Sequence, residues 1–445
     1  MRKILLIGNG AREHALAEAL INSKHQVELY AFGQAINPGI KQLSIQYKVG
    51  SSSDFEAISA FASEVSPDFV VIGPDDPIGQ GLGDFLLQHN NLRSVAPLKI
   101  TAQLETSKAF TRELMAKYQI PGLPKFKVFH NADGISAFLA DELGGNFVIK
   151  YDGLLGGKGV KLSGEHLPDI NAGVAFAEEC LADCDRVVIE EKLVGQEFSL
   201  LALADGENLY TFPAVQDHKR AYNGDEGPNT GGMGTYSDSD GSLPFLEAND
   251  LQDARQINQQ ILKAVKTETG TPFTGVLYGG FMVTSNGVRV IEYNARFGDP
   301  EAMNLLNLLK DDFVELCEAI LAGDLNKFPA EFTKQATVCV YAVPKGYPEN
   351  PQKGAIIKLN KGDYPAKVYF ASVNLLNETD AYYELEMSGS RAIAFVGMGA
   401  TIEEAREQAL TGLGQIEGPI EYRTDIGSGA ILQAKIKMMQ NLRNS

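Results

Sequence analysis

Residues 288–296 read Val288-Arg289-Val290-Ile291-Glu292-Tyr293-Asn294-Ala295-Arg296, a pattern typical of a β-strand. Because side chains alternate between the faces of a strand, Glu292, Asn294 and Arg296 are predicted to share one face, about 6.6 Å apart in turn. Carboxylate and amide oxygens suit a hard cation such as Mg²⁺, and a guanidinium grips an anion with two donors. With the polar turn Phe297-Gly298-Asp299-Pro300-Glu301 behind it, the row predicts a metal-nucleotide site. A solvated strand face with weak ion pairs is the alternative.

The composition is that of an acidic, soluble globular enzyme. In 445 residues, 44% are apolar and 22% charged, which suits about two to four domains. The net charge of −18 and the lack of a Lys/Arg cluster argue against a nucleic-acid partner. An acidic protein that binds anions must gather its cations locally. The candidates are Lys108, Lys150, Lys158, Lys219, Arg220 and Arg296.

The chain is expected to be cytoplasmic. No apolar run approaches the roughly 18 residues of a membrane span. The strand Lys3-Ile4-Leu5-Leu6-Ile7 begins too early to leave room for a signal peptide. Four cysteines do not make a disulfide framework, so we interpret them as small core residues. They are Cys180, Cys184, Cys317 and Cys339.

The first hundred residues alternate strands and helices, which predicts a parallel sheet covered on both faces. The strands are expected at Ile4–Ile7, Val27–Ala31 and Phe69–Ile72, and the helices at Arg12–Asn22 and Asp54–Glu64. Ligands bind such sheets at the carboxyl ends of the strands. Those ends are Gly8-Asn9-Gly10, Ala31-Phe32-Gly33 and Gly73-Pro74-Asp75.

The loop Gly8-Asn9-Gly10-Ala11-Arg12-Glu13 is close to a dinucleotide fingerprint, but Glu13 replaces its third glycine. A bulky acid there would crowd and repel a pyrophosphate. A smaller phosphorylated ligand is therefore favoured, with Arg12 and backbone N–H groups as donors.

A second unit covers about residues 101–320. A helix is expected at Leu104–Lys117, then a strand Phe147–Lys150, a glycine-rich loop and a strand Val160–Leu162. The loop is not a Walker A motif, because Asp152 stands where its first glycine belongs and Gly159 where Ser or Thr is needed. It is predicted to close over phosphates with Lys158, the alternative being a flexible surface hairpin.

Two further segments predict ligand contacts. The strand Arg186–Glu191 and the link after it could present backbone to a purine, and Glu197 could accept from ribose, although a lone glutamate means little. The segment 224–234 holds five glycines in eleven positions, which suits an anion cradle. His218, before it, lacks an obvious partner and is interpreted as an orienting residue.

The remaining elements lead into a third unit, residues 334–430, which is expected to complete the core or the substrate cleft. A hairpin turns at Asn286-Gly287, and one amphipathic helix covers Asn304–Leu321. A linker, 323–333, leads to strands at Thr337–Ala342 and Arg391–Val396 and a helix Ile402–Leu410 that Gly412 would end.

Taken together, these pieces resemble the ATP-grasp superfamily and, within it, the phosphoribosylamine–glycine ligase family. The matching stretches span all but the C-terminal third in the expected order. They are Gly8–Ala15, Gln103–Phe110, Asp217–Arg220, Gly227–Gly234 and Asn294–Glu301.

The resemblance implies an α/β and α+β fold in three domains. These are an N-terminal parallel βαβ substrate-binding domain (1–100), an ATP-grasp domain (101–325, with a lid subdomain at about 123–193) and a C-terminal mixed α+β domain (330–430). It implies ATP-dependent joining of glycine to phosphoribosylamine through glycyl phosphate, with Mg²⁺ or Mn²⁺, by a monomer or weak homodimer. Another ATP-grasp carboxylate–amine ligase and a nucleotide-binding regulatory protein are the alternatives.

Roles for individual residues also follow from the resemblance. The implied catalytic residues are Arg296, Lys158, Asp217, Lys219 and Arg220. The implied ATP-binding residues are Lys108, Lys150, Gly157, Lys158, Glu190, Glu191, Lys192, Leu193 and Glu197. The residues implied to bind phosphoribosylamine and glycine are Gly8, Asn9, Gly10, Arg12, Glu13, Gly73, Pro74, Asp75, Pro228, Asn229, Thr230, Gly231, Gly232, Met233, Arg296 and Asp299. The implied metal ligands are Glu292 and Asn294.

The sequence departs from the family at a few positions. Thr106 stands where a glycine is usual, and Tyr151, Leu155 and Gly156 replace alanines. Ala96-Pro97-Leu98 and Ala31-Phe32-Gly33-Gln34 also differ from the usual residues. The superfamily often has a second acidic metal ligand one strand before Glu292. Leu277-Tyr278-Gly279-Gly280 offers none, so another group or water must complete the coordination.

Overall fold

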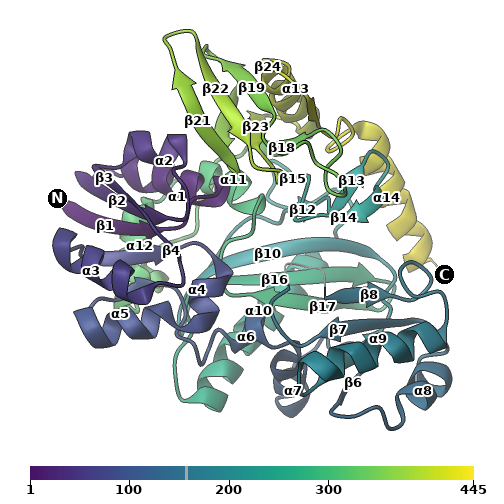
Figure 1. The fold of residues 1–445 in the computed structure, drawn as a ribbon. Coiled ribbons are helices and arrows are strands. Elements are labelled where there is room, and N and C mark those ends of the chain that lie inside the picture. The colour runs from purple at the N-terminus through teal and green to yellow at the C-terminus, as the bar shows by residue number, and fades with distance from the viewer. Residues whose placement is uncertain (156–158, 445) are drawn as a thin grey trace.

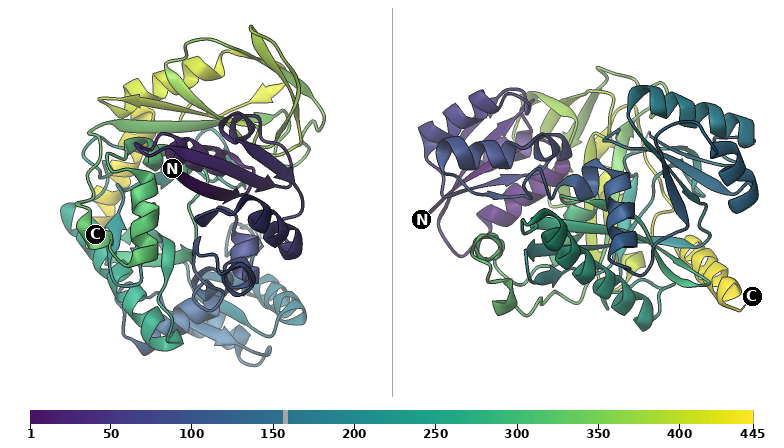
Figure 2. Two further views of the ribbon diagram at one scale, coloured as in Figure 1. Left: turned by 90° about the vertical axis from the view of Figure 1, so that its left-hand side faces the viewer. Right: turned by 90° about the horizontal axis from the view of Figure 1, so that it is seen from below.

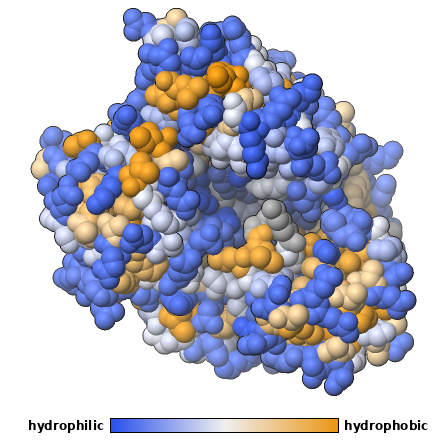
Figure 3. All heavy atoms as spheres, viewed as in Figure 1, coloured by the Kyte–Doolittle hydropathy of each residue, from blue (hydrophilic) through white to orange (hydrophobic). Residues whose placement is uncertain are grey.

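The computed structural model describes residues 1–155 and 159–444. The parallel N-terminal sheet lies at one side, the central sheets below and to the right, and the C-terminal strands above (Figure 1). The face seen in that view is hollowed where these parts meet (Figure 3). The two further views in Figure 2 show that the N-terminal, central and C-terminal parts do not lie in one plane. Among the described residues no helix is long and apolar enough to cross a membrane.

The N-terminal part is a five-stranded parallel sheet in the order β3-β2-β1-β4-β5. The apolar run Ile4–Ile7 is fully buried because helices cover both faces. This order brings the carboxyl ends of β1, β2 and β4 side by side, and the predicted parallel sheet is confirmed. The elements are β1 (Arg2–Ile7), α1 (Ala11–Ile21), β2 (Val27–Gly33), α2 (Pro38–Leu43), β3 (Gln46–Val49), α3 (Phe55–Val65), β4 (Phe69–Ile72), α4 (Asp75–Gln80), α5 (Leu82–Asn90) and β5 (Ser94–Val95).

The central part holds two four-stranded antiparallel sheets, β6-β9-β7-β8 and β11-β10-β16-β17. Its strands are β6 (Phe126–Phe129), β7 (Phe147–Tyr151), β8 (Val160–Leu162), β9 (Val187–Glu191), β10 (Gln196–Asp205), β11 (Leu209–Thr211), β16 (Thr274–Thr284) and β17 (Gly287–Asn294). Its helices are α6 (Gln103–Thr106), α7 (Lys108–Lys117), α8 (Ile135–Ala137), a π turn (Phe138–Glu142), α9 (Ile170–Asp183) and α10 (Ala248–Thr269). The first sheet has its own apolar core, separate from the main one.

The prediction of a single helix at Leu104–Lys117 is wrong, because the helix is interrupted at Ser107. Ser107 is extended, with φ −139° and ψ 111°, and its hydroxyl accepts from the Phe110 amide at 2.9 Å. Ser107 thus caps α7 and separates it from α6. The break places Lys108 at the start of a helix that faces the glycine-rich loop.

Strand β17 contains a bulge at the row of functional side chains. Gly280 pairs with Glu292 and Phe281 with Val290, so Ile291 is an extra residue. Val288 and Val290 are buried before the bulge and Tyr293 is buried after it. The extra residue therefore turns Glu292 and Asn294 away from the core face.

The C-terminal part is built around the sheet β12-β15-β18-β23-β20, with a second sheet β21-β22-β19-β24. Two strands from the middle of the chain, β12 (Gln216–Asp217) and β15 (Gly234–Ser237), complete the first sheet, and β13 (Arg220–Tyr222) pairs with β14 (Glu226–Asn229). The later strands are β18 (Ala336–Pro344), β19 (Ile356–Asn360), β20 (Ala366–Phe370), β21 (Val373–Glu378), β22 (Tyr382–Met387), β23 (Ile393–Gly399), β24 (Ile416–Glu417) and β25 (Ile420–Glu421). The helices are α13 (Ile402–Leu413) and α14 (Gly429–Arg443).

Two helix predictions near these strands are wrong. The helix expected at Asn304–Leu321 is divided into α11 (Glu301–Leu305), a 3₁₀ turn (Leu306–Leu308) and α12 (Phe313–Ala322), followed by a 3₁₀ turn (Leu325–Lys327). Asp312 caps α12 by accepting from the amides of Val314 and Glu315. Helix α13 does not end at Gly412 but continues to Leu413. The glycine allows close packing instead, since a Cβ there would lie 2.4 Å from the Phe395 ring.

All four cysteines are free thiols. Cys180, Cys317 and Cys339 are buried, as predicted, whereas Cys184 is half-buried at the end of α9.

Candidate functional site

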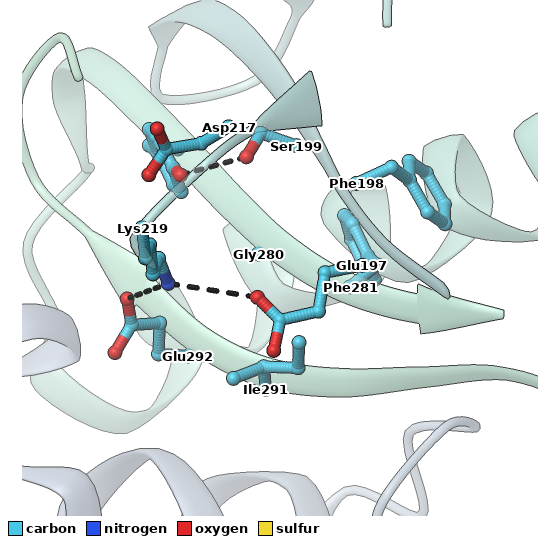
Figure 4. Close-up of a pocket in the computed structure, with 10 residues that line it drawn as sticks. Glu197, Phe198, Ser199, Asp217, Lys219, Gly280, Phe281, Ile291 and Glu292 are labelled. Carbon is cyan, nitrogen blue, oxygen red and sulfur yellow. Dashed lines mark hydrogen bonds and ion pairs between the residues drawn. The ribbon is translucent and has the colours of Figure 1, made fainter. Parts of the chain in front are cut away.

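A small pocket lies between strands β10, β12, β16 and β17 (Figure 4). It is lined by Glu197, Phe198, Ser199, Asp217, Lys219, Tyr278, Gly280, Phe281, Ile291 and Glu292. Its centre is the Lys219 ammonium, whose Nζ lies 3.7 Å from Glu197 Oε2 and 4.0 Å from Glu292 Oε1. Four residues that the sequence singled out separately, Glu197, Asp217, Lys219 and Glu292, therefore meet here.

The charges of this pocket set the protonation of its members. Burial opposes ionisation of Glu292, but Lys219, Lys150 and Lys108 outweigh it and lower the pKa of Glu292 to about 2. Glu197 in turn raises the pKa of Lys219 despite burial. Burial, with the nearby Glu301 carboxylate, raises the pKa of Asp217 well above its usual range. Glu292 is thus anionic and Lys219 cationic at neutral pH.

The residues on β17 fit a divalent cation only in part. Glu292 supplies an ionised oxygen, and Asn294 Oδ1 accepts at 3.2 Å from the Arg296 guanidinium. In the described part of the chain no three His, Cys, Asp or Glu side chains cluster as a metal site. An Mg²⁺-like ion commonly takes one or two protein oxygens and completes its shell with phosphates and water. These two residues suit that arrangement.

Two of the predicted phosphate-binding lysines are tied to the backbone around the pocket. Lys150 Nζ donates to the Ile291 carbonyl at 2.8 Å, forms an ion pair with Glu190, and is buried. Lys108 Nζ donates to the Gly153 carbonyl at 2.6 Å. Both ammonium groups therefore lie close to the strand ends and loop base where phosphates were expected. Gly157 and Lys158 lie outside the described residues.

Arg112 on α7 joins the two central sheets and was missed from the sequence. It donates to both Glu190 oxygens, at 2.6 and 3.2 Å, and to the Ile291 carbonyl at 2.7 Å. It is 2% exposed, so its guanidinium contacts protein groups rather than solvent. The one available signal was an arginine on the buried face of an amphipathic helix.

The side chains of the predicted adenine segment are already bound to protein. Glu190 is held by Arg112 and Lys150. Glu191 accepts from the Lys125 amide at 2.7 Å, and Lys192 Nζ donates to the Ser163 carbonyl at 2.8 Å. Any contact with a base is therefore left to backbone groups and Leu193.

The N-terminal loop is filled by Glu13. Its Oε2 accepts from the Gly10 amide at 2.7 Å and its Oε1 from Arg12 Nε at 2.6 Å. A Cβ on Gly73 would lie 2.1 Å from the same carboxylate. Glu13 therefore fills the space between the Gly10 amide, Arg12 and Gly73. Arg12 also reaches the Phe297 carbonyl at 3.2 Å.

Arg296 faces the N-terminal part. Its guanidinium lies 3.0 Å from Glu105 and 3.8 Å from Asp75. Glu105, which the sequence reading missed, is buried and also accepts from the Ala295 amide at 2.8 Å. Its role could not be read locally, because its partners lie about 190 residues away in the sequence. Arg296 thus links the Gly73–Asp75 turn to the end of β17.

Arg391 from the C-terminal part holds the predicted glycine-rich cradle, and was also missed. Its Nη1 donates to the carbonyls of Gly231, Gly232 and Asp299 at 2.6, 2.9 and 2.9 Å. Its guanidinium lies over the Tyr341 ring, whose hydroxyl donates to Asp299 at 2.6 Å. The Pro228–Gly232 loop and Asp299 therefore form one unit.

Two residues beside this loop are placed differently from what the sequence suggested. Met233 has a buried side chain, and both of its backbone groups bond to neighbours, His218 and Tyr341. It therefore supports the loop from within. His218 does have a partner: Nδ1 lies 3.0 Å from Asp225, and burial lowers its pKa to about 4.

Comparison with known proteins gives the same outline. Family models of phosphoribosylglycinamide synthetase match in chain order: the N domain at residues 2–105, the ATP-grasp (A) domain at 106–302 and the C domain at 337–429. The phosphoribosylamine–glycine ligases of Methanocella arvoryzae and Methanocaldococcus jannaschii are each 44% identical, over 99% of this chain and 100% of theirs.

Solved structures extend the comparison. The Thermotoga maritima phosphoribosylamine–glycine ligase is 29% identical with a TM-score of 0.78, over 95% of this chain and 100% of that one. The biotin carboxylase domain of a Hydrogenobacter thermophilus 2-oxoglutarate carboxylase has a TM-score of 0.70 at 13% identity, over 100% and 95%, which shows a shared fold alone. By its domain matches and its full-length relatives, the chain belongs to the phosphoribosylamine–glycine ligase family of ATP-grasp enzymes.

Proposed function

We propose that the chain joins glycine to 5-phosphoribosylamine at the expense of ATP, giving glycinamide ribonucleotide, ADP and phosphate through glycyl phosphate. One observation carries the proposal. A single strand end presents Glu292 to the Lys219 pocket and Arg296 to the N-terminal loops. A nucleotide on one side and a phosphorylated amine on the other would meet at that point.

We assign the roles from these positions and, for Lys158, from the family resemblance alone. Lys108, Lys150 and Lys158 hold ATP phosphates, and the Glu190–Leu193 segment with Glu197 holds the nucleoside. Glu292 and Asn294 hold Mg²⁺ or Mn²⁺, which would neutralise phosphate charge when bound. Arg12, Asp75, the Gly8 loop and the Pro228–Gly232 loop surround phosphoribosylamine.

The reaction needs two transfers. A glycine carboxylate oxygen attacks the γ-phosphorus of ATP, and ADP leaves. The amine nitrogen then attacks the acyl carbon, the C–O bond to phosphate breaks, and the amine loses a proton. Lys219 and Arg296 are cations on either side of the expected path, so they stabilise charge on the transferred phosphoryl and the acyl oxygen. No covalent link to the protein is required.

Isotope transfer tests the intermediate. Glycine labelled with ¹⁸O in its carboxylate should pass one labelled oxygen to the released phosphate, because that oxygen bridges carbon and phosphorus in glycyl phosphate. ADP formation should require glycine and phosphoribosylamine together. Unlabelled phosphate would exclude glycyl phosphate. ADP formation with other amines or acids would favour a different ATP-grasp ligase, and no ADP at all a regulatory protein.

We also propose that the division into 1–100, 101–325 and 330–430 reflects three folding units, that the enzyme works in the cytoplasm, and that it is a monomer or weak homodimer. Sedimentation at micromolar concentration tests the last point.

A further inference from the structure

The end of the chain reaches the segment that carries Lys219. Arg423 follows β25 and is 1% exposed. Its guanidinium grips Asp425 through two bonds of 2.9 and 2.7 Å. It also donates to Asp225 Oδ1 at 2.7 Å and to the Arg220 carbonyl at 3.0 Å. One buried side chain therefore ties the C-terminal segment to both ends of the turn between Arg220 and Asp225.

Hydrogen bonds made by the side chains of Asp425, Asn223 and Thr424 reinforce this link. The Gly224 amide donates to Asp425 at 2.8 Å. The Thr424 amide donates to Asn223 Oδ1 at 3.0 Å, and the Asn223 amide group donates back to the Thr424 hydroxyl at 3.0 Å. The β13–β14 hairpin is thus fixed along residues 223–225 by residues 423–425.

Helix α14 supplies a second contact from beside the hairpin (Figure 1). Lys435 is 9% exposed, and its Nζ donates to Gln216 Oε1 at 3.0 Å and lies 3.6 Å from Asp225 Oδ2. Gln216 also donates to the Glu197 carbonyl at 2.7 Å. The helix therefore touches the start of β12 and the turn of the hairpin at once, although the matched C domain ends at residue 429.

Asp225 connects Arg423 and Lys435 to His218, which lies between two residues of the pocket. Besides Arg423 and Lys435 it bonds His218 Nδ1 at 3.0 Å. The His218 ring is fully buried, and its Nε2 has no hydrogen-bond partner among the described residues. Because Asp217 and Lys219 flank His218 and line the pocket, fixing the imidazole fixes the direction in which both neighbours leave the strand.

We propose that Arg423 and Lys435 are positioning residues for the ligase: through Asp225 and His218 they hold the Asp217–Arg220 segment so that Lys219 lies between Glu197 and Glu292. The inference rests on the proposed function for what the pocket does. Neither residue touches the pocket itself. Displacing a catalytic group by about 1 Å is enough to lower turnover about 100-fold, so a well-folded protein could still be a poor enzyme.

The test compares variants of Arg423, which precedes α14, and of Lys435 and Arg443, which lie on α14. Arg423→Met and Lys435→Met remove the proposed links. Arg443→Met is the matched control, because Arg443 pairs with Asp250 of α10 and with Glu247, the residue before that helix, and not with the described residues of the hairpin. All three should lower the melting temperature. Only the first two should lower kcat, by about 10-fold or more, with KM for ATP within about threefold. Arg423→Lys keeps the positive charge but loses the two parallel donors of the guanidinium. It should therefore recover little of the kcat that is lost in Arg423→Met.

Amide exchange gives a readout that does not need turnover. The amides of Thr230 and Met233 donate to the carbonyls of Lys219 and His218 at 2.7 and 2.8 Å. They should exchange faster in Arg423→Met and unchanged in Arg443→Met. Unchanged exchange and kcat in Arg423→Met, or an equal kcat loss in Arg443→Met, would overturn the inference. An inactive wild type whose exchange responds as expected would instead count against the proposed function alone. Asp225→Asn replaces Arg423→Met if the latter does not fold.

Discussion

Arg296 lies among charges that two parts of the chain contribute. We expect Arg296→Lys to lower turnover by about 10²–10³-fold, since lysine keeps the charge toward Glu105 and Asp75 but loses a preorganised donor. Arg289→Lys on β17 is the matched control, because the side chain of Arg289 makes, among the described residues, no hydrogen bond stronger than a 3.5 Å bond to the Val288 carbonyl. Turnover under saturating substrates and nucleotide affinity by calorimetry measure the effect. Equal rates in both variants would make Arg296 ordinary strand surface.

Glu292→Gln should keep the fold and lose turnover. The swap is nearly isosteric but removes the ionised oxygen beside Lys219, and an amide is a weaker ligand for a hard cation. ADP formation should fall about 100-fold or more and recover partly at high Mg²⁺. Glu207→Gln, which breaks an exposed pair with Lys266, controls for loss of a surface carboxylate. An unchanged Mg²⁺ dependence would remove Glu292 from the metal site.

Among single functional residues, the sequence predicts those that share one local periodicity. Glu292 and Asn294 could be found because strand alternation puts them on one face of β17, and Arg296 because it continues the same spacing just past the end of the strand. Arg112, Glu105 and Arg391 could not, because their partners lie 78 to 190 residues away and only packing brings them together.

Single residues also decide how the elements end. The alternating pattern identified β17 but not its bulge, and the amphipathic pattern identified the helices around Lys108 and Asn304 but not the breaks at Ser107 and Asp312. In each case a side-chain cap or an extra unpaired residue overrides the periodicity, and no pattern of apolar positions reports it.

Gly412 offers a test of such an override. Alanine in a helix gains about 1 kcal/mol over glycine, but at Gly412 its Cβ would lie 2.4 Å from the Phe395 ring. Overpacking of this kind costs about 1–3 kcal/mol, so Gly412→Ala should be neutral to destabilising. Gly414→Ala meets nothing closer than 3.4 Å and should be neutral or stabilising. Urea unfolding of both variants measures the difference, and equal stabilisation would show that α13 can move away from β23.

Across the whole molecule, the sequence predicts the order of the parts but not how they share strands. The N-terminal sheet follows from its βαβ pattern. The C-terminal sheet takes β12 and β15 from the middle of the chain, and β13–β14 is fixed by residues 423–425. Such pairings between distant segments carry no local signal, which is why the sequence predicts no more for the last third than that it completes the core or the substrate cleft.

The interface between the N-terminal and C-terminal parts contains a histidine that must stay neutral. His14 on α1 stacks on Phe370 of β20, with ring centroids 5.8 Å apart, and its Nδ1 accepts from the Phe370 amide at 3.0 Å. Burial lowers the pKa of His14 to about 4, although Glu18 opposes the shift. Protonation would therefore remove the acceptor and put a charge into the interface.

The contribution of the buried histidines to stability should fall as the pH falls from about 6.5 toward 4, whereas Asp217, whose pKa is raised, acts in the opposite direction. The unfolded chain binds a proton on each histidine near its ordinary pKa of about 6.5, whereas folded His14 and His218 bind one only near 4. The contribution is complete above pH 6.5 and is worth roughly 3 kcal/mol per histidine. Carboxylates with lowered pKa, such as Glu292, act only below about pH 4.5, the ordinary range of their unfolded forms.

Removing the titrating group should flatten this dependence. In His14→Asn the amide oxygen keeps an acceptor near the Phe370 amide but does not titrate. The variant should be less stable at pH 7.5, because the smaller side chain leaves space beside Phe370. Its free energy of unfolding, from urea titrations at pH 7.5, 6 and 5, should then fall less steeply, by up to about 1.4 kcal/mol per pH unit. The exposed His89→Asn should keep the wild-type slope. If both variants keep that slope, acid does not act through the contact between α1 and β20.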